Sequence, residues 1–134
     1  MPSIPEDLAY LLRTNVVAHV SLARADGSIV THVMWVDCDE DHILVNTEVH
    51  RRKYQNVLAD PRVAVMIFDA NDDQRYADVT GRVVERITGP QAREHIEKLA
   101  HRYMGRPFIE SLIRSERVIL RIEPDRQRVR HVPS

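Results

Sequence analysis

The 134-residue sequence has one cysteine, two lysines and four glycines, and it has no long apolar run. Because Cys38 stands alone, no disulfide can form within the chain, and a reducing, cytoplasmic location is expected. No apolar stretch approaches the ~18 residues that a membrane-spanning helix needs. Residues 1–7 lack a basic segment followed by an apolar one, so we expect neither a signal peptide nor a membrane partner.

An excess of charge of either sign is also absent. The chain has 19 basic and 20 acidic residues and a net charge of -1, which argues against nucleic acid binding through a strongly basic surface. Among the basic residues only Lys53 and Lys98 are lysines, and the others are arginines. This bias has two explanations: a GC-rich genome, or a use of planar guanidinium groups for binding anions. Only local clustering of the cations can separate them.

The apolar periodicity predicts one mostly β, α+β domain over residues 1–134. Helices are expected over 5–15, 48–60 and 89–103, and strands over 16–23, 29–36, 43–47, 62–68, 76–87, 118–122 and 129–132. Residues 37–42 are expected to form an acidic turn, and 104–115 has little pattern. Tight turns make neighbouring strands antiparallel, and barrel closure is a common way to hide strand edges. We therefore expect a small antiparallel barrel with peripheral helices.

The pattern also predicts burial and irregularity at particular positions. Strand 62–68 is almost continuously apolar, which predicts that both of its faces are covered. Gly81 interrupts strand 76–87 and indicates a bulge or bend. Four residues of the third helix are expected to face inward: Ala92, Ile96, Leu99 and Ala100.

The strongest local feature is the basic cluster His50-Arg51-Arg52-Lys53, with Asn56 one turn later. It follows a strand and opens a helix, where free backbone N–H groups and the helix dipole favour an anion. Cations normally prefer the other end of a helix, so their placement here is unfavourable unless an anion compensates. The two interpretations are a solvated basic surface and a pocket for the phosphate or carboxylate groups of a ligand.

Other kinds of site have weak support. The Asp37–Asp41 run resembles a calcium loop, but His42 stands where such a loop needs glycine. The seven histidines show no zinc-type spacing, and His19 and His32 are not expected to face each other on neighbouring strands. Motifs for a nucleophilic serine, a phosphate loop or a dinucleotide fold are absent. We therefore predict no metal site and assign no catalytic residue.

The segment Thr31-His32-Val33-Met34-Trp35 lies in an expected strand and carries the only tryptophan. One interpretation is a core aromatic residue with a polar neighbour. The other is a strand that borders a flat ring ligand, because cofactor sites combine apolar walls with a few placed donors.

Taken in order, these motifs resemble the pyridoxamine-phosphate-oxidase-like superfamily of flavin and deazaflavin oxidoreductases. The resemblance covers residues 8–133, and its most specific part is the stretch from Arg51 to Val63 that reads R-x-K-x-x-N-h-x-x-D-P-R-h. Strands 31–36 and 43–47 and segments 76–81 and 117–124 also fit. The chain looks most similar to the branch that uses coenzyme F420, a deazaflavin. It ends in Arg130-His131-Val132-Pro133-Ser134 rather than the Arg-Leu-x-Pro of true pyridoxamine-phosphate oxidases, so vitamin B6 chemistry is not expected.

The resemblance implies an antiparallel split β-barrel of the FMN-binding type that forms a homodimer, with cofactor sites in grooves between the subunits. It implies that the basic pair contacts the cofactor phosphate, that strand 31–34 lies beside the ring, and that one strand end lies near the ribityl chain. The implied cofactor-binding residues are Arg51, Lys53, Asn56, Thr31, His32, Val33, Met34, Asn46, Thr47 and Tyr76. The implied activity is F420-dependent hydride transfer to a small organic acceptor. An FMN-dependent oxidoreductase or flavin reductase, a non-catalytic cofactor carrier and an unrelated small barrel remain as alternatives.

Overall fold

A computed structural model describes residues 3–132 of the chain. Residues 1, 2, 133 and 134, which include the last two positions of the C-terminal segment discussed above, lie outside the described residues. The elements, in chain order, are α1 (Glu6–Leu12), β1 (Ala18–Ala23), β2 (Ile29–Met34), β3 (Asp37–Cys38), β4 (Ile43–Glu48), α2 (Arg52–Ala59), β5 (Arg62–Asp69), β6 (Asp72–Thr88), α3 (Pro90–Met104), the 3-10 helix η1 (Glu110–Leu112) and β7 (Arg117–His131). No helix in this described part is long and apolar enough to cross a membrane.

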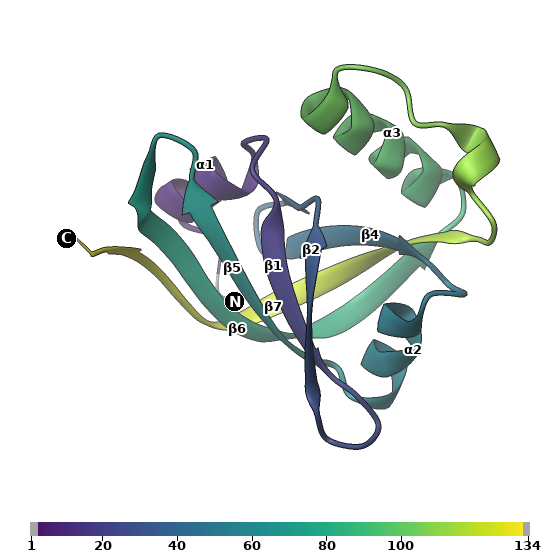
Figure 1. Cartoon of the computed structure of the whole chain (residues 1–134), viewed down its shortest axis with the longest axis horizontal. Coiled ribbons are helices and arrows are strands. Elements are labelled where there is room, and N and C mark those ends of the chain that lie inside the picture. Colours follow the sequence, from purple (N-terminus) through teal and green to yellow (C-terminus); the bar gives the residue numbers. More distant parts are fainter. Residues whose placement is uncertain (1–2, 133–134) are drawn as a thin grey trace.

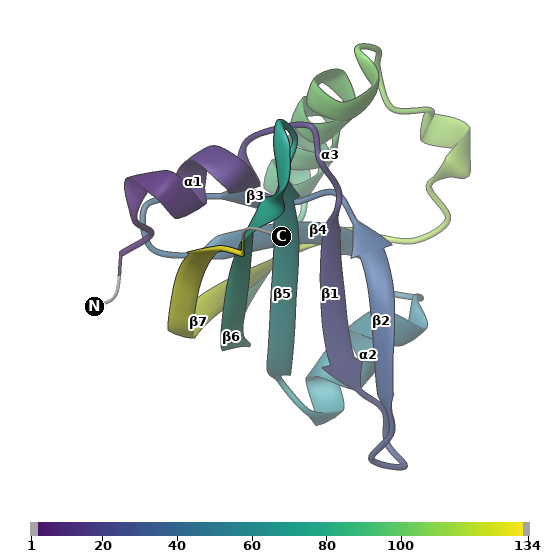
Figure 2. The same ribbon diagram turned by 60° about the vertical axis from the view of Figure 1, so that its left-hand side comes forward.

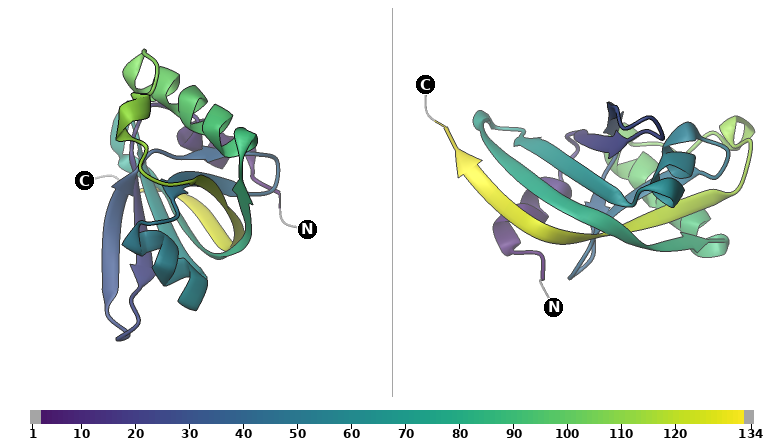
Figure 3. Two further views of the ribbon diagram at one scale, coloured as in Figure 1. Left: turned by 90° about the vertical axis from the view of Figure 1, so that its right-hand side faces the viewer. Right: turned by 90° about the horizontal axis from the view of Figure 1, so that it is seen from below.

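All the strands belong to one antiparallel sheet with the order β2-β1-β5-β6-β7-β4-β3. The long strands β6 and β7 cross the molecule side by side and bend strongly, so that the sheet curves around its interior (Figure 1; Figure 3, right). The edge strands β2 and β3 are not paired with each other, and the barrel is therefore split rather than closed. The predicted mostly β fold with peripheral helices is confirmed.

The predicted irregularity at Gly81 is confirmed as a shift in register between β6 and β7, which falls between Thr80 and Gly81. A Cβ atom at position 81 would overlap the carbonyl oxygen of Glu123 and lie 3.1 Å from Cα of Pro124. Only glycine therefore allows the two backbones to approach this closely at the bend.

Helix α1 lies at one end of the curved sheet (Figure 2) and fills its interior with leucines. Leu8, Leu11 and Leu12 are almost completely buried, as their helical spacing predicts. They join a core built from the inward-facing residues of the sheet, such as Val20 and Val65.

Helix α3 begins at Pro90, whose missing N–H costs nothing at this position, and ends at Met104. Gly105 caps it with a left-handed backbone, at a φ of 69°. The four residues predicted to face inward are all buried. The helix lies beyond one end of the sheet, and residues 105–116 return from it to β7 (Figure 1; Figure 3, left).

Some sequence-based boundaries were wrong. Residues 37 and 38 form the short buried strand β3 rather than part of an exposed turn, because Asp37 is held by partners distant in sequence. The two C-terminal strands are one continuous strand, because β6 pairs with β7 along almost its whole length. Strand β5 is buried on one face and half-buried on the other, so its continuous apolar run does not reflect complete burial within this chain. Helix α2 starts four residues later than predicted, because Glu48 belongs to β4.

Candidate functional site

A cavity of about 250 Å³ lies where β2, β4, α2, α3 and β7 meet. Most of its walls come from the end of β2 with the residue after it, the end of β4 and the start of α2. Helix α3, strand β7 and the segment that joins α3 to β7 contribute one residue each. The lining residues are Val33, Met34, Trp35, Asn46, Thr47, Arg51, Lys53, Ile96, Phe108 and Arg117. One part of this set is cationic and the other is apolar and aromatic.

The cationic part consists of Arg51, Lys53 and Arg117. Arg51 is the N-cap residue of α2, and the first turn of that helix carries no acidic side chain. Burial lowers the pKa of Lys53, and the positive charges of Arg51 and Arg117 lower it further. These cations repel one another. An anion bound among them would relieve the repulsion, so the arrangement favours anion binding.

The buried carboxylate of Glu48, which pairs with Arg117, partly balances these charges. Its Oε1 accepts a hydrogen bond from Nη1 of Arg117 at 3.1 Å. Its Oε2 accepts from the backbone N–H groups of Arg114 at 3.0 Å and Ser115 at 2.9 Å. Burial alone would raise the pKa of Glu48, but these hydrogen bonds and the Arg117 charge hold it below its usual value. Glu48 is therefore an anion, and three cations facing one anion leave the site positive.

The apolar part is built around Trp35, which is stacked on Tyr103 with ring centroids 5.3 Å apart and an interplanar angle of 7°. The rings of Phe108 and Trp35 form a T-shaped pair, with centroids 6.4 Å apart and an interplanar angle of 86°. Tyr103 donates its hydroxyl hydrogen to the Val16 carbonyl at 2.8 Å and accepts from the Val36 N–H at 3.1 Å. These bonds fix the ring behind Trp35, so the tryptophan presents a rigid, flat wall to the cavity.

Six of the ten residues predicted to bind a cofactor line this cavity: Val33, Met34, Asn46, Thr47, Arg51 and Lys53. Their convergence is a property of the fold, since β2 and β4 are far apart in the order of the sheet. Asn46, however, has both of its amide hydrogens engaged inside the protein, by the Ala92 carbonyl and by His95.

The other four predicted residues do not line the cavity. Thr31 lies on the outer face of β2, where its hydroxyl is 2.9 Å from that of Ser21. His32 points to the opposite face from Thr31 and has a buried Nε2 with no partner among the described residues. Asn56 is on the second turn of α2. Tyr76 of β6 packs against Phe68 of β5, with ring centroids 6.0 Å apart. Thr31 shares its face of β2 with Val33, and His32 shares its face with Met34, so position along the strand separates them: only the last residues of β2 reach the cavity.

Four lining residues are not among the ten predicted: Ile96, Phe108, Arg117 and Trp35, for which the sequence left a core position and a ring-bordering strand both open. Arg117 lies just before the predicted strand 118–122 and was part of the segment 117–124 that fits the family resemblance, but it was given no role in the site. Phe108 lies in a segment without periodicity, and no sequence signal marks it.

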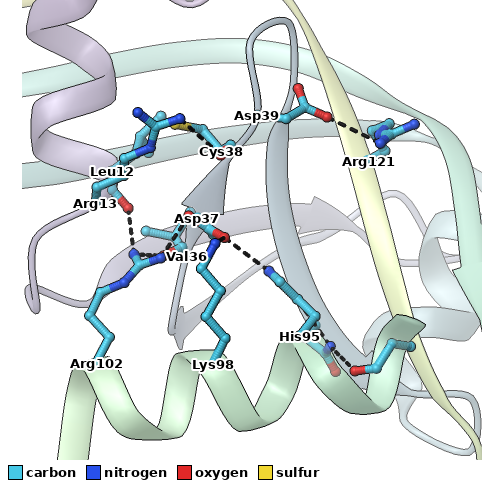
Figure 4. Close-up of polar contacts among 12 residues, drawn as sticks. Leu12, Arg13, Val36, Asp37, Cys38, Asp39, His95, Lys98, Arg102 and Arg121 are labelled. Atoms are coloured by element: carbon cyan, nitrogen blue, oxygen red, sulfur yellow. Dashed lines mark hydrogen bonds and ion pairs between the residues drawn. The ribbon is translucent and has the colours of Figure 1, made fainter. Parts of the chain in front are cut away.

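A second polar cluster surrounds Asp37, which is 2% exposed. Side chains of α3 converge on this carboxylate (Figure 4): Nε2 of His95 at 3.2 Å, Nζ of Lys98 at 3.2 Å and Nη2 of Arg102 at 2.7 Å. Burial opposes ionisation, but His95 and Arg102 outweigh it and hold the pKa of Asp37 far below its usual value. The cluster attaches α3 to β3, and α3 in turn forms one wall of the cavity.

Residues 4–131 match the family model for pyridoxamine 5'-phosphate oxidase. The chain belongs to the pyridoxamine 5'-phosphate oxidase family. Among curated proteins, none matches it.

Several solved structures have a similar fold. An F420 reductase is 28% identical, with a TM-score of 0.82 over 93% of this chain and 98% of that one. The conserved hypothetical protein Rv2991 of Mycobacterium tuberculosis is 21% identical, with a TM-score of 0.76 over 93% and 82% of the two chains. General Stress Protein 26 of Bacillus anthracis is 16% identical, with a TM-score of 0.68 over 95% and 97%. The last two similarities concern the fold alone.

Family membership and the F420 reductase neighbour make this a protein of flavin- or deazaflavin-type oxidoreductase fold. The residues of the cavity fit a phosphate-bearing ring cofactor. Its cations suit a phosphate, and its apolar wall of Trp35, Met34 and Val33 suits a flat ring.

Proposed function

We propose that the protein is an oxidoreductase that uses coenzyme F420 to transfer a hydride to a small organic acceptor. One observation carries the proposal: three cations and a rigid aromatic wall share one cavity, and among the described residues Glu48 alone pairs with one of these cations. The 28% identity to an F420 reductase favours the deazaflavin over FMN.

In this proposal the chain holds the cofactor by its charged tail. Arg51 and Lys53 have no side-chain partner among the described residues, so both are free to donate to phosphate oxygens. The Thr47 hydroxyl at the end of β4 also has no hydrogen bond there and can donate to the same group. Bound F420 would supply a hydride, a two-electron reductant, to an activated double bond or a similar acceptor.

The apolar residues act on the ring side of the site. Trp35, Met34 and Val33 form a wall for a flat ring, and Ile96 and Phe108 help to exclude water. No carboxylate or imidazole is among the described residues that line the cavity. The proton that completes a reduction is therefore expected from solvent or from the substrate.

We also propose that the protein forms a homodimer, in which a second copy covers the outer face of the sheet beside the site. Ile29 and Val33 on the edge strand β2 are 66% and 62% exposed, and Val33 lines the cavity as well. The neighbouring residues Met66 and Phe68 of β5 are half-buried on the same face. Light scattering on the purified protein should give twice the mass of one chain, whereas a monomer at micromolar concentration would contradict this part of the proposal.

The decisive experiment is a titration of the purified protein with F420 and with FMN, followed by ligand fluorescence. We expect F420 to bind more tightly. Tight FMN binding without F420 binding would replace the proposal with an FMN-dependent oxidoreductase, and binding of neither would contradict the proposed function. Turnover of reduced F420 with enones, quinones and tetrapyrroles then separates an enzyme from a carrier, because a carrier binds without turnover.

A further inference from the structure

Asn46 lines the cavity, yet it has no hydrogen to donate to a ligand. Its Nδ2 donates one hydrogen to the Ala92 carbonyl at 2.9 Å and the other to Nδ1 of His95 at 3.1 Å. Its Oδ1 accepts from Nε of Arg117 at 2.9 Å. An anion needs donors, and both donors of Asn46 are occupied, so a direct contact with phosphate would break a buried hydrogen bond.

The orientation of the Asn46 amide is determined by its partners. Turning the amide over would place its oxygen against the Ala92 carbonyl oxygen and its NH₂ group against the N–H of Arg117. Both contacts would be repulsive. The observed orientation in turn requires that Nδ1 of His95 accepts, and therefore that the imidazole carries its hydrogen on Nε2.

Asp37 fixes that form of the imidazole. Its Oδ2 lies 3.2 Å from Nε2 of His95 and can only accept, because Asp37 is ionised. His95 is 8% exposed and Asn46 is also 8% exposed, so water does not compete strongly for either group. A continuous buried chain of hydrogen bonds therefore runs from Asp37 through His95 and Asn46 to Arg117.

Arg117 is the end of this chain that faces the cavity. Nε is held by Asn46, Nη1 is held by Glu48, and the guanidinium carbon lies 5.4 Å from the centroid of the Phe108 ring. A guanidinium has five N–H donors. Because only two are used within the described residues, the remaining ones are presented to the cavity in a fixed direction.

We propose that Asn46 and His95 are positioning residues of the anion site, which act through Arg117 and do not touch the ligand themselves. This role rests on the proposed function, since it assumes that the cavity binds a phosphate-bearing cofactor. It replaces the direct cofactor contact that the family resemblance implied for Asn46.

Two substitutions of His95 separate this role from simple support of the fold. Asparagine places an oxygen near the position of Nδ1, so His95→Asn keeps an acceptor for Asn46 and loses the bond to Asp37. Glutamine places an NH₂ group near Nε2, so His95→Gln keeps a donor to Asp37 and loses the acceptor. Lys98→Gln is the control, because Lys98 contacts Asp37 but not Asn46.

Binding of F420 and of FMN is measured for each variant, together with thermal unfolding. We expect His95→Gln to bind about 3- to 10-fold more weakly, the effect of one hydrogen bond, and His95→Asn to recover most of that loss while melting at a lower temperature. Asn46→Leu should bind the cofactor about 10- to 100-fold more weakly, because Arg117 then loses the hydrogen bond that orients its guanidinium group. Lys98→Gln should bind as the wild type does. Equal binding by His95→Gln and wild type, or a loss in His95→Asn as large as in His95→Gln, would overturn the proposal.

Nitrogen NMR of the free protein tests the same network without any ligand. We expect His95 in the Nε2–H form at neutral pH, and a slowly exchanging Nε–H signal of Arg117 that is lost in Asn46→Leu and retained in His95→Asn. A His95 hydrogen on Nδ1, or an Arg117 signal that is insensitive to Asn46, would refute the positioning role. If the wild type bound neither F420 nor FMN, the proposed function would fail, and these two signals would still decide whether the network exists.

Discussion

Replacing Lys53 with methionine should weaken cofactor binding and at the same time make the free protein more stable. The side chain lies in the cavity without an acidic partner among the described residues, and burial and the neighbouring Arg51 and Arg117 lower its pKa. Methionine keeps the length of the aliphatic stem and removes the charge. A residue retained for structure would show the opposite effect on stability.

The size of both effects follows from the surroundings of Lys53. A charge-assisted hydrogen bond to phosphate contributes about 1.5–3 kcal/mol, so the dissociation constant of F420 should rise about 10- to 150-fold. Relief of desolvation and of repulsion from Arg51 and Arg117 should stabilise the fold by about 0.5–1 kcal/mol, or roughly 1–5 °C in melting temperature for a chain of this size. Arg52→Met is the matched control, since Arg52 is exposed on the same helix turn and does not line the cavity.

The assays are a fluorescence titration with F420 and calorimetric unfolding of the ligand-free protein at several pH values. Because the pKa of Lys53 is lower in the folded protein than its ordinary 10.5, the unfolded chain binds the proton more tightly. The wild type should therefore gain stability relative to Lys53→Met as the pH rises through the lowered pKa towards 10.5. Unchanged affinity in Lys53→Met, or a lower melting temperature at neutral pH, would refute the reasoning.

Three further predictions concern other parts of the molecule. Asp37→Ala leaves three donors of α3 without their buried carboxylate, and it should lower the free energy of unfolding, measured in urea, by about 3–5 kcal/mol. Because the pKa of Asp37 is lower in the folded protein than its ordinary 3.8, the carboxylate stabilises the fold above pH 3.8, and this stabilisation is lost as the pH falls below that value. The variant should therefore lose less stability in acid than the wild type does. Gly81→Ala should destabilise the fold by about 1–3 kcal/mol, because the new Cβ overlaps the Glu123 carbonyl, and equal stability would contradict the close approach of β6 and β7. Trp35 is the only tryptophan and lines the cavity, so its emission should be quenched on addition of FMN or F420, and an unchanged spectrum at saturation would place the ligand elsewhere.

The elements that the sequence predicts well are those stabilised by local patterns. The leucine spacing of α1 and the alternation of β1 follow from contacts between residues a few positions apart. The basic start of α2 could be predicted for the same reason, because a helix N-terminus preceded by a strand end is visible within one short segment.

The polar framework of the site could not be predicted, because its partners are far apart in the chain. Asp37 was assigned to an acidic turn, yet the side chain that fixes it, His95, is 58 residues away. Arg117 meets Asn46 across 71 residues, and only the pairing of β4 with β7 brings them together. A hydrogen bond between such residues leaves no periodicity in a single sequence, so its members look like ordinary surface polar residues.

The split in the barrel and the position of the site have one cause. Val33, Met34 and Trp35 belong to or follow β2 at one edge of the sheet, whereas Asn46 and Thr47 belong to β4 next to the other edge. If hydrogen bonds joined these edges, backbone and core side chains would occupy the space between them. Because the sheet stays open there, side chains from both edges face a shared cavity, and α3 holds its wall in place through Asp37 and His95. Unpaired strand edges can promote aggregation, but in this chain the opening between the two edges provides the space in which a ligand can bind.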